Sequence, residues 1–276
     1  MPFLKNIKGK EPVEIFYQDY GTGKPVILIH GWPLSHQSWE GQIRTLVEEG
    51  FRVIAYDRRG FGKSSQPWGE YDYTTLAGDL RELILELDLQ DVTLVGFSMG
   101  GGEVVRYITE FGTDRIIKAA LIASIIPIVA QKEDNPEGVP QKALDEILGA
   151  LKTDRVGFLK GFHKNFYNYE KESTGVSKAN LDFDFSVASQ ASPIATIKTA
   201  EAWAGTDFRS ELKNVKVPTL IVHGDNDNIV PYKTAGEQAA SGIEDTIFHL
   251  IKGAPHGLNL TNGDELNKIL LDFLKN

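Results

Sequence analysis

Residues 92–111 read VTLVGFSMGGGEVVRYITEF and contain the parts of one structural unit. Residues 92–95 form a short apolar run typical of a buried strand, and residues 103–111 have a helical pattern. Between them the motif G-x-S-x-G places Ser98 on a tight turn from strand to helix. Such a turn holds the hydroxyl above the edge of a sheet, at a helix N-terminus that favours developing negative charge. We therefore predict that Ser98 is a nucleophile rather than an incidental serine in a glycine-rich turn.

Short apolar runs alternate with helical patterns along most of the chain. Residues 75–87 and 265–274 carry leucine and isoleucine at helical spacing, with charged side chains on the opposite face. This alternation predicts an α/β fold with a mostly parallel, doubly wound sheet and helices on both faces. The apolar runs, which fit strands covered on both faces, lie at residues 26–29, 51–56, 92–95, 116–123, 219–222 and 246–251.

The alternation breaks between about residues 124 and 212. This stretch lacks a clear apolar strand and is rich in aromatic residues, among them Phe162, Phe166 and Trp203. A connection this long is rarely without structure, so we predict a mainly helical insertion that forms a lid over the sheet. Most of its aromatic side chains are expected in the core, and others around an apolar pocket for a small acyl or aryl group. No Gly/Ser-rich or Pro-rich linker is present, so we predict one domain over residues 1–276.

Composition narrows the class of protein. With 276 residues, 41% of them hydrophobic and 24% charged, the chain has an ordinary globular composition and can bury a large core. Its net charge of −9 disfavours nucleic acid or an anionic membrane as a partner. The absence of cysteine excludes disulfides, a thiol nucleophile and Cys-based metal sites. We expect a cytoplasmic protein, because the first residues lack a secretory signal and the longest apolar stretch, 119–130, is too short to span a bilayer.

A serine hydroxyl needs a neighbouring base to take its proton, and histidine suits that role near neutral pH. His30 and His223 end apolar runs, where a packed or hydrogen-bonded structural role is expected. Three other histidines lie in an early loop, in the lid and within a predicted strand. His256 lies in GAPHG at 253–257, between the last predicted strand and the last helix. Open α/β sheets place their sites in such loops, so we predict that His256 is the base rather than a histidine in a plain turn.

A third group must orient the imidazole and stabilise its positive form. For a serine on such a turn, the chain order serine, acid, histidine places this group before His256, at a strand end. The stretch HGDNDNIVP at 223–231 offers Asp225 and Asp227. It is not a calcium loop, because the fifth and sixth positions of that motif are Ile229 and Val230. We predict Asp227 as the acid and Asp225 as a turn-capping carboxylate.

Motifs for other chemistry are absent from the sequence. The stretch GFGKS at 60–64 resembles the end of a P-loop, but the first glycine of that motif is replaced by Asp57. The third position of a dinucleotide-binding G-x-G-x-x-G within 96–101 is Ser98. Neither H-E-x-x-H nor a Cys/His set occurs. We therefore predict no nucleotide cofactor and no metal.

Five stretches together resemble the α/β-hydrolase superfamily and, more narrowly, its cofactor-free bacterial haloperoxidases, also described as perhydrolases and aryl esterases. They are HGWPLS at 30–35, YDRRGFGKSS at 56–65, GFSMGGGEV at 96–104, HGDNDNIVP at 223–231 and GAPHGL at 253–258. They occur in family order over nearly the whole chain. Arg58 and Arg59 are interpreted as structural. DNPEGVP at 134–140 in the lid is also family-like, whereas the rest of the lid matches less closely.

The resemblance implies a catalytic triad of Ser98, Asp227 and His256, with an oxyanion hole formed by the backbone N–H groups of Trp32 and Met99. It implies acyl transfer without a cofactor or metal, on a small ester or carboxylic acid. Hydrogen peroxide in place of water would give a peracid, which then oxidises bromide or chloride away from the enzyme. The resemblance also implies a homodimer or homotrimer.

Two alternatives remain. A plain carboxylesterase, lactonase or amidase would use the same chemistry with no role for peroxide. A hydrolase-fold ligand receptor would keep the triad and act by binding, and slow turnover with a covalent or lid-closed complex would favour it. Superfamily relatives that open epoxides or displace halide carry aspartate at the nucleophile position, so Ser98 disfavours both activities.

Overall fold

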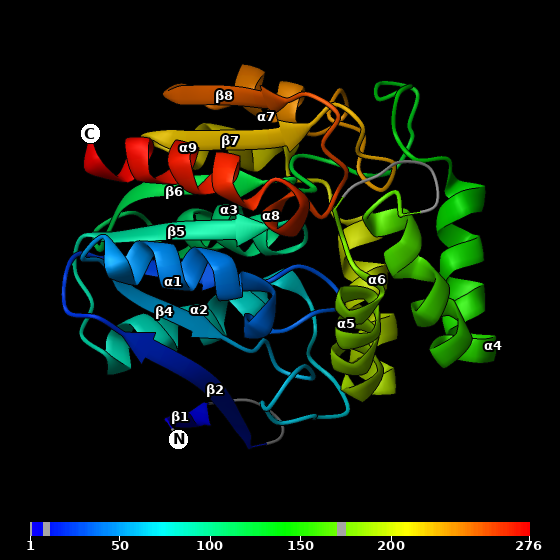
Figure 1. The fold of residues 1–276 in the computed structure, drawn as a ribbon, viewed down its shortest axis with the longest axis horizontal. Coiled ribbons are helices and arrows are strands. Elements are labelled where there is room, and N and C mark those ends of the chain that lie inside the picture. The colour runs from blue at the N-terminus through cyan, green and yellow to red at the C-terminus, as the bar shows by residue number, and fades with distance from the viewer. Residues whose placement is uncertain (1, 8–11, 170–174) are drawn as a thin grey trace.

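The computed structural model describes residues 2–7, 12–169 and 175–276 (Figure 1). Its strands form one eight-stranded sheet in the order β1-β2-β4-β3-β5-β6-β7-β8. Strand β2 is antiparallel to both β1 and β4, and the other pairs are parallel. The predicted mostly parallel α/β sheet is therefore confirmed. The strands are β1 (Phe3–Ile7), β2 (Val13–Tyr20), β3 (Pro25–Ile29), β4 (Arg52–Tyr56), β5 (Val92–Phe97), β6 (Ile116–Ile122), β7 (Thr219–Gly224) and β8 (Thr246–Ile251).

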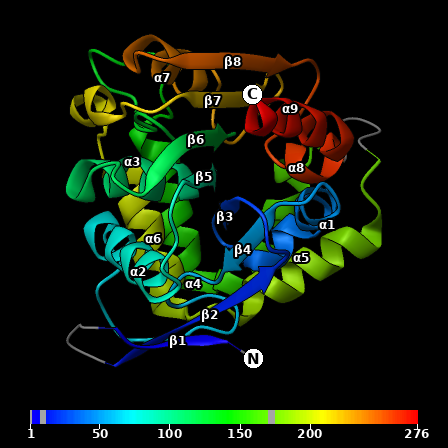
Figure 2. The ribbon, with the colours of Figure 1, turned by 90° about the vertical axis from the view of Figure 1, so that its left-hand side faces the viewer.

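Side chains of the sheet alternate between two separate cores. In β3, Ile27 and Ile29 belong to one core, and Val26 and Leu28 belong to the other. Helices α1, α8 and α9 lie in front of the sheet in Figure 1, and Figure 2 shows α2 and α3 on the opposite side. These helices and two further elements, η1 and α7, are η1 (His36–Trp39), α1 (Glu40–Glu48), α2 (Tyr73–Glu86), α3 (Gly100–Phe111), α7 (Gly236–Gly242), α8 (Leu258–Thr261) and α9 (Gly263–Lys275).

A helical insertion between β6 and β7 forms the predicted lid (Figure 1). It lies beyond the carboxyl ends of the parallel strands, so that it covers the edge where β5 delivers Ser98. Two of its helices begin at serines, Ser177 and Ser192, whose side chains accept backbone N–H groups of the first turn. Its elements are α4 (Gln141–Phe166), α5 (Lys178–Gln190), α6 (Pro193–Gly205) and the 3-10 helix η2 (Arg209–Asn214).

None of the helices within the described ranges is both long enough and apolar enough to cross a membrane.

Candidate active site

Ser98 lies on the turn between β5 and α3. Its backbone φ of 53° is in the left-handed region, which is strained for a residue with a Cβ atom. The glycines on either side of Ser98 are required because a side chain would not fit at these positions. A Cβ atom at Gly96 would lie 2.6 Å from the backbone of Gly100, and one at Gly100 would lie 2.5 Å from the carbonyl oxygen of Ile29. This tight turn presents the Ser98 hydroxyl at the carboxyl end of β5.

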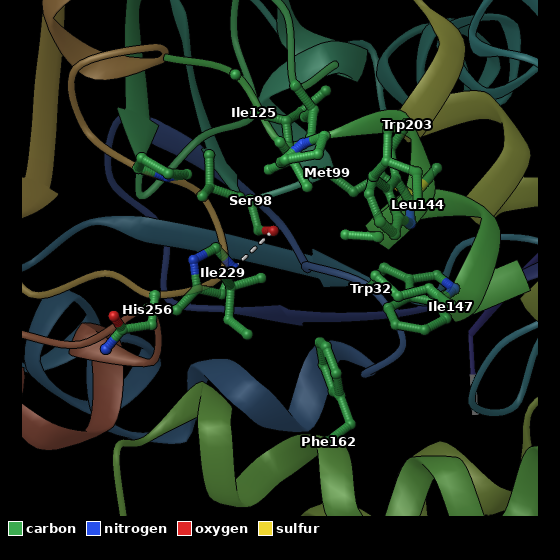
Figure 3. A pocket seen from close by; sticks show the side chains of 18 residues that line it. Trp32, Ser98, Met99, Ile125, Leu144, Ile147, Phe162, Trp203, Ile229 and His256 are labelled. Carbon is green, nitrogen blue, oxygen red and sulfur yellow. Dashed lines mark hydrogen bonds between the residues drawn. The ribbon is translucent and has the colours of Figure 1, made fainter. Parts of the chain in front are cut away.

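His256 lies beside Ser98, in the loop between β8 and α8. Its Nε2 atom is 2.9 Å from Oγ of Ser98, the hydrogen bond drawn in Figure 3. Its Nδ1 atom is 2.7 Å from Oδ2 of Asp227. An ionised carboxylate can only accept hydrogen bonds, so Nδ1 carries the proton and Nε2 is left to accept the proton of the serine. The structure thus brings the three predicted residues into one hydrogen-bonded chain.

The carboxylate of Asp227 is buried and accepts four hydrogen bonds. Its Oδ1 atom accepts the N–H groups of Ile229 at 2.9 Å and Val230 at 2.8 Å. Its Oδ2 atom is shared by His256 and by Nε2 of His223, at 3.1 Å. Burial by itself would raise the pKa of Asp227, but the two histidines and their hydrogen bonds lower this pKa well below its ordinary value. Asp227 is therefore held as a carboxylate across the neutral range.

Asp225 makes a different contact. Its Oδ1 atom accepts the N–H of Gly253 at 2.5 Å, which ties the loop after β7 to the loop after β8. The backbone N–H of Asn226 adds a second tie to the carbonyl of Ala254, at 3.2 Å. The contact is structural, as predicted for Asp225, although it reaches another loop rather than capping its own turn.

The contact between His223 and Asp227 does not follow from the sequence pattern. The prediction for this residue was a packed or hydrogen-bonded structural role, and the structure gives that hydrogen bond to Asp227 itself. The same Nε2 atom lies 2.9 Å from the carbonyl oxygen of Val230. The feature of the sequence that could have indicated this contact is the position of His223, four residues before Asp227 and at the end of the strand that leads to it.

The loop that contains Arg58 and Arg59 is held by buried ion pairs. Arg58 pairs with Glu103 of α3, and its backbone N–H donates to Nε2 of His30 at 3.0 Å. Arg59 pairs with Asp79 of α2 at 2.6 Å. Neither arginine lines the cavity beside Ser98, and these contacts agree with the structural role predicted for both.

An apolar cavity of about 360 Å³ opens beside Ser98 and His256 (Figure 3). The lid supplies one wall, the loops after β3, β6 and β7 supply others, and the segments after β5 and β8 supply Ser98, Met99 and His256. No Asp, Glu, Lys or Arg is among its lining residues. Of the lid aromatics, Phe162 and Trp203 reach the cavity, whereas Phe166 and Tyr167 are buried in the core. The lining is Trp32, Ser98, Met99, Ile125, Val129, Gly138, Val139, Pro140, Ala143, Leu144, Ile147, Phe162, Trp203, Asn228, Ile229, Val230, Pro231 and His256.

Trp32 and Met99, the predicted oxyanion-hole residues, both line this cavity next to Ser98. Trp32 lies in the loop after β3, and its indole Nε1–H donates to the carbonyl oxygen of Thr196 in α6 at 3.1 Å. Met99 follows Ser98 at the N-terminal end of α3. Their backbone N–H groups as oxyanion donors stay a prediction. Within residues 2–7, 12–169 and 175–276, no cluster of His, Asp or Glu has the arrangement of a metal site.

The fold, and the order of serine, acid and histidine along the chain, are those of the α/β hydrolases. The chain belongs to the alpha/beta hydrolase fold family, whose model matches residues 24–263.

Within this family the chain is similar over its full length to non-haem haloperoxidases and to an esterase/perhydrolase. It is 39% identical to the non-heme chloroperoxidase CPO-A1 of Kitasatospora aureofaciens, over 96% of this chain and 97% of the relative. It is 35% identical to the bifunctional esterase/perhydrolase DCH of Acinetobacter calcoaceticus, over 96% and 98%. The crystal structure of bromoperoxidase from Bacillus anthracis matches with a TM-score of 0.95 and 46% identity, over 100% of both chains. The chain is an enzyme of this haloperoxidase and esterase group, as the sequence resemblance implied.

Proposed function

We propose that this enzyme transfers acyl groups through Ser98, with His256 as general base and Asp227 as the carboxylate that orients it. The observation that carries the proposal is the chain of hydrogen bonds from Ser98 to His256 to Asp227, 2.9 Å and 2.7 Å long, beside an apolar cavity. A serine hydroxyl gains nucleophilicity from such a base, and the carboxylate stabilises the imidazolium that forms.

In the first half of the reaction, Oγ of Ser98 attacks the carbonyl carbon of an ester while Nε2 of His256 takes the hydroxyl proton. The negative oxygen of the tetrahedral intermediate is stabilised by the backbone N–H groups of Trp32 and Met99. His256 then gives the proton to the leaving alcohol, which departs and leaves an acyl group on Ser98. A carboxylic acid acylates the serine in the same way, with water as the leaving group.

In the second half, His256 takes a proton from the incoming nucleophile as it attacks the acyl-serine. Water gives a carboxylic acid, and hydrogen peroxide gives a peracid. The released peracid oxidises bromide or chloride in solution, so that halide oxidation follows from acyl transfer and needs no halide site. The names of the relatives as chloroperoxidase, bromoperoxidase and esterase/perhydrolase support this sequence of steps.

Bromination of a reporter dye in acetate buffer with peroxide and bromide tests the proposal, with Ser98→Ala as the matched blank. We expect the variant to lose at least about 1000-fold in kcat while keeping the Tm of the wild type, because the serine acts as a unit with its base. Equal bromination by both proteins would contradict peracid formation at Ser98.

A plain carboxylesterase or lactonase is the second candidate, favoured by the esterase activity named for the Acinetobacter relative. If neither folded protein brominates the dye, but the wild type hydrolyses a panel of esters and Ser98→Ala does not, this candidate replaces the first.

A further inference from the structure

We propose that His223 is a positioning residue for the reaction. It holds the Asp227 carboxylate in place and weakens the electrostatic attraction between this carboxylate and protonated His256. The inference rests on the proposed function of Ser98, His256 and Asp227. His223 does not line the cavity, so it would act only through Asp227.

The proton of His223 can be assigned from its partners. Its Nε2 atom lies 2.9 Å from the carbonyl oxygen of Val230 and 3.1 Å from Oδ2 of Asp227. A carbonyl oxygen only accepts hydrogen bonds, so Nε2 must carry a proton. That one N–H is shared between the carbonyl and the carboxylate. His223 therefore donates to the same oxygen that accepts from His256.

The ring of His223 is confined. The residue is fully buried at the end of β7. A Cβ atom at Gly236 would lie 3.1 Å from its Nδ1 atom and equally close to the ring of Phe248. A side chain at position 236 would therefore press on the imidazole, and the two acceptors at Nε2 orient the ring towards Asp227. The two backbone donors hold Oδ1, whereas His223 and His256 both hold Oδ2, so that His223 helps to fix the rotation of the carboxylate.

Sharing Oδ2 has an electrostatic consequence. Each donor withdraws negative charge from the oxygen, so His223 weakens the hold of Oδ2 on a protonated His256. Among the described residues, the titratable side chains hydrogen-bonded to Asp227 are His223 and His256, and His256 contacts Asp227 and Ser98. Removing the His223 donor should therefore make His256 more basic and leave the Asp227 carboxylate less well aligned.

Two variants separate the hydrogen bond from the space that the ring fills. His223→Leu removes the donor, whereas His223→Gln keeps an N–H donor at a similar reach. For His223→Leu we expect the acid flank of the kcat/KM profile with p-nitrophenyl acetate to move up by about half a pH unit or more. We expect its kcat to fall about tenfold, because Asp227 is less well placed. His223→Gln should restore most of both properties.

A stability control keeps the test sharp. Leu220→Ala removes a buried side chain from the same strand and should lower Tm without moving the pH flank. If His223→Leu behaves like Leu220→Ala, with a lower Tm and an unchanged flank, His223 has only a structural role and the proposal is wrong. The proposal also fails if the kcat/KM profiles of His223→Gln and His223→Leu have their acid flanks at the same pH.

A second readout does not depend on turnover. In ¹⁵N-histidine-labelled protein, the NMR titration of the His256 imidazole should move to higher pH in His223→Leu and not in His223→Gln. Were the wild type to lack Ser98-dependent turnover while this shift appeared, the proposed function would fail and the role of His223 towards Asp227 would stand. An unmoved titration would overturn that role.

Discussion

Asp225 and Asp227 stand two residues apart after the same strand, yet their carboxylates contact different loops. Asp227 reaches His256, and Asp225 reaches the backbone of Gly253. We expect Asp227→Asn to lower kcat by about 10⁴-fold, since the amide cannot hold the same imidazole tautomer. Asp225→Asn should lower kcat less than about tenfold. Steady-state kinetics with p-nitrophenyl acetate measures both, and the reverse order of effects would mean that Asp225 is the acid.

His163 in the lid helix α4 is buried, and its ring packs edge-on against Phe162 and Phe166. Burial lowers the pKa of His163 to about 4. Its pKa in the unfolded chain is about 6.5, so between these values the unfolded state binds the extra proton. The His163 contribution to stability is complete above about pH 6.5 and falls as the pH drops towards 4.

We therefore expect His163→Leu to lose less stability than the wild type between pH 7.5 and pH 5, by about 1 to 2 kcal/mol of unfolding free energy. Urea unfolding of both proteins at the two pH values measures the difference. Burial also lowers the pKa of His30, to about 3, so part of the acid sensitivity should remain in the variant. Equal losses of unfolding free energy in the two proteins would show that His163 does not bind more protons in the unfolded chain than in the folded one over this pH range.

Ser98, Asp227 and His256 could be predicted because each lies in a short local pattern after an apolar run. The role of His223 could not be predicted in this way. Its contact with Asp227 depends on how the chain turns back after β7, and the spacing of four residues does not specify that turn. A residue that acts through another leaves little trace in a linear pattern.

At the level of elements, the end of helix α4 is joined to the loop that carries His256. The N–H of Gly257 donates to the carbonyl oxygen of Phe166 at 3.0 Å. A Cβ atom at Gly257 would lie 2.2 Å from the ring of Tyr167, which its hydroxyl bond to Asp184 holds in place. The position of His256 is thus coupled to the packing of the lid.

We expect Gly257→Ala to lower both kcat/KM and the unfolding free energy, the latter by about 1 to 3 kcal/mol, because the added methyl group overpacks this contact. Gly263→Ala at the start of α9 is the matched control, since its Cβ atom would meet only Gln42 at 3.8 Å. Ester hydrolysis and thermal unfolding measure the pair. An unchanged Gly257→Ala enzyme would show that the lid and the His256 loop move independently.

The strands that the sequence predicts are those with two covered faces. The hairpin of β1 and β2 escaped prediction because it lies at one edge of the sheet, where the second half of β2 is only partly buried and its apolar run is broken. The helices α2 and α9 were predictable from spacing, because each covers one face of the sheet with a continuous apolar stripe.

At the scale of the whole molecule, the cavity combines the lid with the turns and loops after β3, β5, β6, β7 and β8, and no Asp, Glu, Lys or Arg lines it. An acyl group that enters it must shed its water without gaining an ion pair. We expect kcat/KM for p-nitrophenyl butyrate to exceed that for p-nitrophenyl hemisuccinate by about 100-fold or more. Similar values for the two esters would place the acyl group outside the cavity.

The helical character of the lid was predictable, whereas its choice of pocket residues was not. Phe162 and Phe166 are one helical turn apart, and only the first reaches the cavity. Which aromatic side chain faces the substrate depends on how α4 is rotated and bent against the sheet, including the non-helical backbone at Asp154. Those quantities arise from packing across the whole chain.

The hydrogen-bonded chain of the site joins residues that are distant in sequence: His256 is 158 positions from Ser98 and 29 from Asp227. It spans the sheet from β5 to the loops after β7 and β8, with β6 between them. A refolding polypeptide can therefore gain turnover only when the last strands dock. Ester hydrolysis would report that docking without a label, because a species in which β7 and β8 are not docked lacks the assembled triad.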